Sequence, residues 1–226
     1  AAIAPVCGFF AGPFESNEPP KPAYLKRFVQ CAAPVEVAEN AFQLPVKLMH
    51  GEKDPIVPVQ FSIEINAKLK ELGYRTEIEV YPGVGHDAWV PAYENARIFD
   101  WFSQFERNPA PPKVVFKTGD PQGGSSYWVH IEEPMKIRQF ARIEANIVDG
   151  TVSVKTDNIQ RFSLTIPESL ITPGTTAKII VDDKAVYDGT FSSTVRFLSE
   201  NGEWNVTRDE VPRKLLPSKN GLFAAL

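Results

Sequence analysis

The sequence predicts a protein in two parts, an α/β part with a parallel sheet followed by a mostly antiparallel β-sandwich. In residues 1–108, short apolar runs alternate with apolar residues at helical spacing, which is typical of parallel strands joined by helices. From residue 113 onward, apolar and polar residues alternate with a period of two, and Asp-Gly and Asn-Gly pairs separate the runs. That pattern is typical of short antiparallel strands.

The composition is that of a folded globular chain. Of the 226 residues, 43% are hydrophobic and 23% are charged, and the formal net charge is -4. The basic residues form no block, so we expect no nucleic-acid partner. No apolar run approaches the roughly 18 residues of a membrane span, so we expect no membrane partner. Two cysteines, Cys7 and Cys31, are too few for a disulfide scaffold and are expected to be buried free thiols, which leaves the cellular compartment open.

The elements of the first part follow one another as strand and helix. Residues 2–6 form an apolar run that resembles a strand already under way, as if the chain were a piece of a longer one. Residues 45–50 predict a buried strand that ends at Gly51, and residues 59–72 carry apolar residues at helical spacing before Gly73. Residues 76–81 predict the next strand. A second helix is expected over residues 93–105, with five large side chains packed on the sheet: Ile98, Phe99, Trp101, Phe102 and Phe105.

A stiff linker is expected at residues 109–112, because three of these four residues are proline, which cannot continue a helix. After it, residues 142–154 predict a hairpin around Asp149-Gly150. Residues 161–166 and 177–181 predict further strands, and Asn201-Gly202 marks a second hairpin. The predicted domains are therefore residues 1–108 and residues 113–226.

Two residues at the ends of predicted strands could carry chemistry. Asp54 follows the strand at 45–50, and His86 follows the strand at 76–81 within a loop of small residues. Parallel neighbouring strands bring their carboxyl ends to one edge of the sheet, where open α/β sheets place their sites. A histidine there can act as general base and acid, and an aspartate beside it can fix its tautomer.

A resemblance to a known family rests on one string of residues and on the elements after it: His50-Gly51-x-x-Asp54-x-x-Val57-Pro58, then a helix, a strand and Gly85-His86. This order resembles the last third of an α/β-hydrolase, nearest to the bacterial carboxylesterase, feruloyl-esterase and prolyl-oligopeptidase-like branch. The resemblance covers residues 1–107 and implies that Asp54 is the acid and His86 the base of a catalytic triad. The second part is similar to an accessory β domain that follows the hydrolase in some bacterial esterases.

The sequence departs from the family at the nucleophile. The family carries its serine in Gly-x-Ser-x-Gly ahead of the acid and the histidine. The nearest string lacks the final glycine, follows His86 and is interpreted as a loop: Gly123-Gly124-Ser125-Ser126-Tyr127. The chain is therefore expected to be a fragment that holds two members of the triad and is inactive alone.

Structural roles are the alternative for the other candidates. His50 is expected to be a packed, hydrogen-bonded histidine, and His130 a strand residue. Glu52 and Asp87 flank the motifs but stand outside the family's acid position. Asp54, His86 and Asp87 are too few ligands for a closed metal site, so no metal is expected. Trp89 is either a wall of the substrate pocket or a core residue.

The function that the resemblance implies is hydrolysis of a carboxylic ester through an acyl-enzyme, without a cofactor. The substrate would be a small-molecule or polysaccharide-linked ester. The expected partners are the missing amino-terminal hydrolase segment or a second copy bound at the exposed strand edge. A serine peptidase of the same fold is one alternative. The other is a non-catalytic module that binds carbohydrate or a protein partner, with Tyr127, Trp128 and Trp204 as candidate stacking residues, although their place in the alternation favours a core role.

Overall fold

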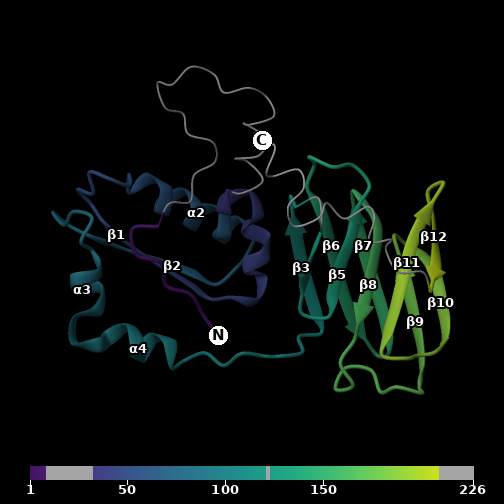
Figure 1. The fold of residues 1–226 in the computed structure, drawn as a ribbon. Coiled ribbons are helices and arrows are strands. Elements are labelled where there is room, and N and C mark those ends of the chain that lie inside the picture. The colour runs from purple at the N-terminus through teal and green to yellow at the C-terminus, as the bar shows by residue number, and fades with distance from the viewer. Residues whose placement is uncertain (9–32, 121–122, 209–226) are drawn as a thin grey trace, which may run out of the picture. The chain divides into compact units, whose positions relative to one another are not determined.

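The computed structural model describes residues 1–8, 33–120 and 123–208, and the chain divides into two compact units. We call them the α/β unit, Ala1–Pro111, and the β unit, Pro112–Leu226 (Figure 1). The prediction for Cys31 lies outside the described residues. Among the residues that are described, no helix is both long and apolar enough to span a membrane.

The α/β unit is built on a parallel pair of strands, β1 (Val46–Gly51) and β2 (Thr76–Tyr81). Helix α2 (Gln60–Glu71) joins them, so the predicted strand-helix-strand order is confirmed. A 3-10 helix, η1 (Pro34–Gln43), precedes β1. The strand predicted at residues 2–6 is present only as two isolated parallel bridges to β1, Ile3 with Val46 and Val6 with Met49.

Both faces of the β1–β2 pair are covered, because successive residues of a strand point to opposite faces. Val46 and Leu48 pack with α2 residues in one buried cluster. Met49 belongs to a second cluster, which contains Ala92 of α3 (Trp89–Tyr93) and two residues of α4 (Arg97–Phe102). The ribbon shows α2 and α4 on opposite sides of the strands (Figure 1). His50 lies two residues after Leu48 in the strand, so its side chain points to the same face and towards α2.

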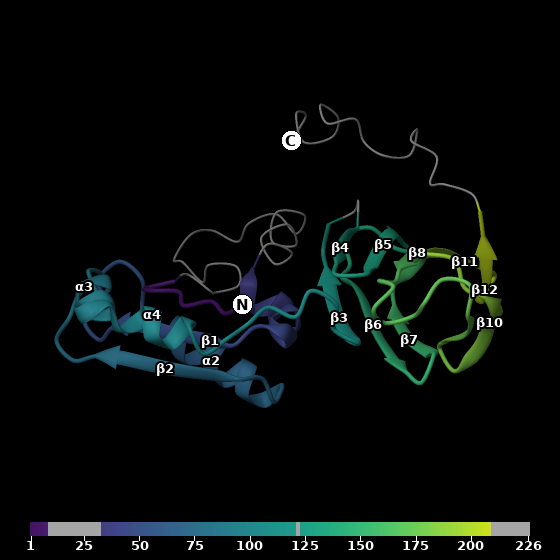
Figure 2. The same ribbon diagram turned by 90° about the horizontal axis from the view of Figure 1, so that it is seen from below.

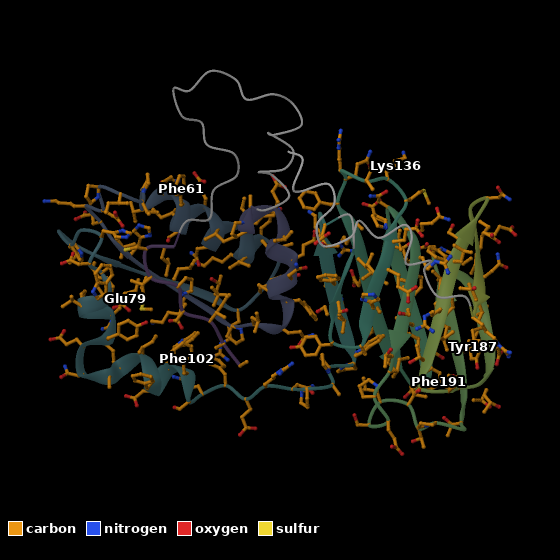
Figure 3. The ribbon with its side chains drawn as sticks, viewed as in Figure 1. Phe61, Glu79, Phe102, Lys136, Tyr187 and Phe191 are labelled. Carbon is orange, nitrogen blue, oxygen red and sulfur yellow. The ribbon has the colours of Figure 1, made fainter. Side chains whose placement is uncertain are left out.

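The single helix predicted over residues 93–105 is wrong. The chain instead forms α3, a short 3-10 turn η2 (Glu94–Ala96) and α4. Asn95 and Ala96 have φ of 54° and 58°, and left-handed residues interrupt a right-handed helix. In the short α4, Ile98 and Trp101 face the core, whereas Phe99 is 62% exposed because it lies on the other side of the helix. Glu79 of β2 and Phe102 of α4 are labelled in Figure 3.

In its described residues, 112–120 and 123–208, the β unit consists of two five-stranded sheets around one hydrophobic core (Figure 2). The first sheet has the order β10-β9-β7-β6-β3. Its strands are β3 (Lys113–Thr118), β6 (Ala141–Val148), β7 (Thr151–Asp157), β9 (Thr176–Val181) and β10 (Lys184–Thr190). The second has the order β12-β11-β8-β5-β4. Its strands are β4 (Gly124–Ser126), β5 (Val129–Pro134), β8 (Ile159–Thr165), β11 (Thr194–Glu200) and β12 (Glu203–Thr207). Because β7 and β9 pair in parallel, the first sheet is mixed and not purely antiparallel.

The predicted hairpins are confirmed. Asp149 and Gly150 turn β6 into β7 with φ of 47° and 74°, and Asn201 and Gly202 turn β11 into β12 with φ of 52° and 79°. Two positive φ values in succession are the signature of a turn that matches the twist of the strands. Phe191, labelled in Figure 3, is 1% exposed within the core of the unit.

The interpretation of residues 123–127 as a loop is wrong, because three of them form β4. This strand pairs with β5, and Ser125 lies opposite His130. The stretch is too short and too rich in glycine and serine to show a strand pattern, so the pairing partner decides its structure. His130 lies in β5, which confirms the prediction of a strand residue.

Candidate active site

The loop after β1 fixes the side chain of Asp54 through backbone hydrogen bonds. Asp54 Oδ1 accepts hydrogen bonds from the backbone amides of Ile56, at 2.8 Å, and Val57, at 2.9 Å. Aspartate commonly closes its own turn in this way. One oxygen is thus held by the loop itself, and Oδ2 is available to a partner from elsewhere in the fold.

The loop after β2 crosses the end of β1 at close range. A Cβ added to Gly51 would lie 2.0 Å from the carbonyl oxygen of Gly85, so the close approach requires glycine at this position. The amide of Lys53 donates to the carbonyl of Val84 at 2.9 Å, which fastens the two loops together. This packing carries His86 to the end of β1.

The structure brings the two predicted residues into contact. His86 Nδ1 lies 2.8 Å from Asp54 Oδ2. A carboxylate only accepts hydrogen bonds, so Nδ1 carries the proton and Nε2 keeps its lone pair. The side chain of His86 is 33% exposed and that of Asp54 is 0% exposed. The pair therefore joins a buried carboxylate to an imidazole with access to solvent, which is the geometry that the acid and the base of a triad require.

The electrostatics of Asp54 favour its charged form. Burial by itself raises the pKa of this carboxyl group. The hydrogen bonds from the Val57 amide, the His86 ring, the Ile56 amide and the Cys7 thiol outweigh burial and hold the pKa well below its usual range. Asp54 is therefore ionised at neutral pH.

Cys7 is a neighbour of Asp54 that the sequence analysis did not include in the site. It is 6% exposed and free, which confirms the prediction of a buried thiol. Burial raises the pKa of the Cys7 thiol, and the adjacent Asp54 carboxylate raises it further. The contact depends on the pairing of residues 3–7 with β1, where the amide of Cys7 donates to the carbonyl of Met49 at 2.9 Å. No local motif in the sequence predicts that pairing.

One group of side chains in the described part of the chain has a geometry that could hold a metal ion. One atom each of Cys7, His50 and Asp54 lies within 4.8 Å of the others. Their polar atoms already have hydrogen-bond partners: His50 Nε2 donates to the carbonyl of Val57, and the Asp54 carboxylate accepts from the Val57 amide and the Cys7 thiol. A metal bound by all three side chains would have to displace the protons on the Cys7 thiol and on His50 Nε2.

The other candidates lie around the pair in different roles. Trp89 is 46% exposed, and its ring meets the ring of His86 edge to face with 5.8 Å between centroids. Glu52 Oε2 accepts from the amide of Gly83 at 2.9 Å and so supports the loop that carries His86. Asp87 is exposed.

The β unit contains its own serine-histidine contact. Ser125 Oγ lies 2.6 Å from His130 Nδ1 across the β4–β5 pair. One candidate stacking residue of this unit is part of its core, and another packs against that core. Trp128 is 3% exposed, and Trp204 lies edge to face with Phe162 and donates to Asp182 Oδ2 at 2.9 Å. The core role that the alternation favoured is confirmed for Trp128, whereas Trp204 and Tyr127 are partly buried and pack against the core.

Comparisons with known proteins match the α/β unit. Residues 29–99 match a family described as Phospholipase/Carboxylesterase. The chain is 42% identical over 71 residues to an acyl-protein thioesterase 1 of Gibberella zeae and 33% identical over 66 residues to one of Neurospora crassa. It is 39% identical over 69 residues to a Bacillus subtilis protein named Uncharacterized peptidase YtmA. These matches support an α/β-hydrolase family, of carboxylesterase or thioesterase type.

The similarity is confined to part of each relative. It covers 31%, 29% and 30% of this chain, and the chain spans 28%, 27% and 26% of the three relatives. A crystal structure of a thermostable esterase matches at 24% identity with a TM-score of 0.32, over 47% of this chain and 25% of that one. A score this low has no bearing on the arrangement of the site.

Proposed function

We propose that the α/β unit supplies the acid and the base of a Ser-His-Asp triad that hydrolyses carboxylic esters through an acyl-enzyme. The observation that carries the proposal is the 2.8 Å contact between His86 Nδ1 and the buried carboxylate of Asp54. The serine would come from a segment of the hydrolase fold that these 226 residues do not include, since the family's nucleophile precedes the acid and the histidine in chain order.

Each residue has a defined task in this mechanism. The serine hydroxyl attacks the ester carbonyl, and His86 Nε2 takes the serine proton and returns it to the leaving alcohol. Asp54 holds the ring in the tautomer that leaves Nε2 free, and its negative charge stabilises the imidazolium. Water then attacks the acyl-enzyme with His86 again as base and frees the acid.

The surroundings of His86 suggest where a substrate would bind. Trp89 offers a half-exposed apolar ring beside the base, so we propose that it forms one wall of the pocket for a small-molecule or polysaccharide-linked ester. We propose that the β unit is an accessory domain to this reaction. We also propose that the hydrolase belongs to the bacterial esterase branch, although two of the relatives are fungal proteins.

An assay of two proteins tests the proposal. The chain as it stands should not hydrolyse p-nitrophenyl acetate above background, whereas a version extended upstream through a Gly-x-Ser-x-Gly segment should. His86→Ala in the extended protein should abolish the activity. Hydrolysis by the chain alone that disappears with Ser125→Ala would contradict the assignment, because it would place the nucleophile in the β unit.

A peptidase of the same fold is the second candidate, favoured by the name of the Bacillus subtilis relative. A thioester in place of the oxygen ester is favoured by the names of the two fungal relatives. Aryl esters, acyl thioesters and proline-containing peptide amides, assayed side by side on the extended protein, separate the three. Preference for the peptide amide would exclude the esterase assignment.

The partner proposal concerns the segment that pairs with β1. The carbonyl of Ile3 accepts from Lys47 of β1 and the amide of Cys7 donates to Met49, and the alternation of a strand turns the backbone groups of Ala4 and Val6 the other way. We propose that this edge binds the amino-terminal hydrolase segment or a second copy of the chain. Light scattering after size-exclusion chromatography should show self-association of the chain alone, and a stable monomer near 25 kDa would contradict this.

A further inference from the structure

His50 is a fully buried polar side chain next to the proposed triad. It is 0% exposed and occupies a position of β1 that faces α2, where an apolar residue would pack at no polar cost. A buried imidazole destabilises the fold unless both ring nitrogens have partners. Both have them here, so the ring has a defined orientation.

The partners of His50 determine its tautomer. Nε2 lies 2.8 Å from the carbonyl oxygen of Val57, which only accepts, so Nε2 carries the proton. Nδ1 then has a lone pair and accepts from the hydroxyl of Ser62, at 2.7 Å. Ser62 belongs to α2 and is 1% exposed. The Val57 carbonyl thereby fixes the proton on the nitrogen that faces the site loop, and Ser62 of the helix holds the other nitrogen.

His50 connects to Asp54 in two ways. The carbonyl oxygen of Val57 accepts from His50, and the backbone amide of Val57 donates to Asp54 Oδ1 at 2.9 Å. In addition, His50 Nε2 lies 3.3 Å from Asp54 Oδ2, the oxygen that accepts from His86. The positive end of the His50 N–H bond thus lies beside the charge that orients His86.

We propose that His50, with its proton fixed by the Val57 carbonyl and its ring held by Ser62, is a positioning residue that holds the Asp54 carboxylate and its loop in the geometry that orients His86. The role rests on the proposed function, since it concerns the same site. It differs from simple packing, because it requires a hydrogen-bond donor at the place of Nε2 and not only a side chain of similar size.

Two substitutions separate these roles. In His50→Gln, the amide nitrogen reaches the place of Nε2 and keeps a donor towards Val57 and Asp54. In His50→Asn, the shorter amide reaches only the place of Nδ1 and loses that donor. His130→Asn is the matched control, because it makes the same change at a histidine that also contacts a serine hydroxyl.

The measurement is NMR of the His86 ring in the 226-residue chain, which reports on the two ring nitrogens and on the Nδ1 proton. In the unchanged protein and in His50→Gln, the Nδ1 tautomer should dominate. In His50→Asn, the other tautomer should appear and solvent exchange of the Nδ1 proton should accelerate roughly tenfold, as expected when one supporting hydrogen bond is lost. In His130→Asn, the His86 signals should not change.

Different outcomes overturn different claims. If the unchanged chain shows no Nδ1 proton bound to Asp54, the triad geometry of the proposed function is wrong. If that proton is present and a folded His50→Asn leaves it unaltered, only the role of His50 is wrong. Should His50→Asn fail to fold, Ser62→Ala tests the same point, because a His50 ring without the Ser62 hydroxyl holds its Nε2 donor less firmly, which should also accelerate exchange at His86. Unchanged exchange in Ser62→Ala would then overturn the proposal.

Discussion

The two units each place a histidine against an oxygen, and the two contacts differ in chemistry. In the α/β unit, His86 meets a carboxylate that is 0% exposed, that two backbone amides hold and whose pKa is lowered. In the β unit, His130 meets the hydroxyl of Ser125, which lies on the short strand β4. The distances are 2.8 Å and 2.6 Å, so proximity alone does not distinguish them.

The difference lies in what surrounds the partner of each histidine. A buried ionised carboxylate fixes the tautomer of an imidazole and stabilises its cation, whereas a hydroxyl can donate or accept and fixes neither. A serine beside a histidine is therefore weaker evidence for catalysis than an acid beside a histidine at the edge of a parallel sheet. The predictions below test that conclusion, beginning with the largest effect.

The largest effect is expected at the two residues proposed for the triad. In the upstream-extended protein, Asp54→Asn and His86→Ala should each lower kcat by roughly 10⁴-fold, because the base loses its orientation or is removed. His130→Ala and Ser125→Ala are the matched changes in the β unit and should leave kcat within about twofold. Steady-state kinetics measure all four. A loss with His130→Ala equal to that with His86→Ala would remove the distinction between the two contacts.

The next effect is a loss of stability in the core of the β unit. Phe162 is 0% exposed, and its ring lies 4.8 Å from that of Phe197 and 5.1 Å from that of Trp204. Phe162→Ala should lower the free energy of unfolding of this unit by about 3–5 kcal/mol. Urea unfolding followed by tryptophan fluorescence measures the loss. The Nδ1 proton of His86 should be unaffected, and its disappearance would mean that the two units do not fold separately.

The lowered pKa of Asp54 predicts a dependence of stability on pH. The charged carboxylate stabilises the fold at every pH above its unfolded pKa, near 4, and this contribution is lost as the pH falls through the lower folded value. The loss from this group should be roughly 2 kcal/mol between pH 5 and pH 2. Asp54→Asn should remove it and flatten the pH profile of stability. Urea unfolding at both pH values gives the comparison, and parallel profiles for the two proteins would contradict the assignment.

Glu52 provides a smaller and more specific comparison with Asp54. Its carboxylate accepts one hydrogen bond from the amide of Gly83 and is exposed, so Glu52→Gln keeps an acceptor oxygen in place. Activity of the extended protein should change by less than about threefold. If Glu52→Gln proved as damaging as Asp54→Asn, the acid of the triad would be Glu52.

The smallest effect is expected at Cys7. Its raised pKa and 6% exposure predict slow alkylation, because the thiolate is the reactive form. In a Cys31→Ser background, iodoacetamide at pH 8 should label the folded chain much more slowly than the unfolded chain. Rapid labelling of the folded chain, followed by mass spectrometry, would show that residues 3–7 separate from β1.

Local patterns in the sequence were sufficient for much of this protein. The bounds of β2 and the places of the Asp149-Gly150 and Asn201-Gly202 turns follow from periodicity and from residues that tolerate positive φ. The pairing of Asp54 with His86 follows from the order of elements, because parallel strands bring their carboxyl ends to one edge. These features depend on residues that lie close together in the chain or on one rule of topology.

The tertiary structure alone decided the features that depend on a distant partner. The left-handed residues Asn95 and Ala96 divide a helix that its composition would allow, and β4 exists because β5 lies beside it. Cys7 reaches Asp54 only through the register of residues 3–7 on β1. Such contacts join segments far apart in the sequence, and their free energy comes from packing and hydrogen bonds that no short stretch of residues contains.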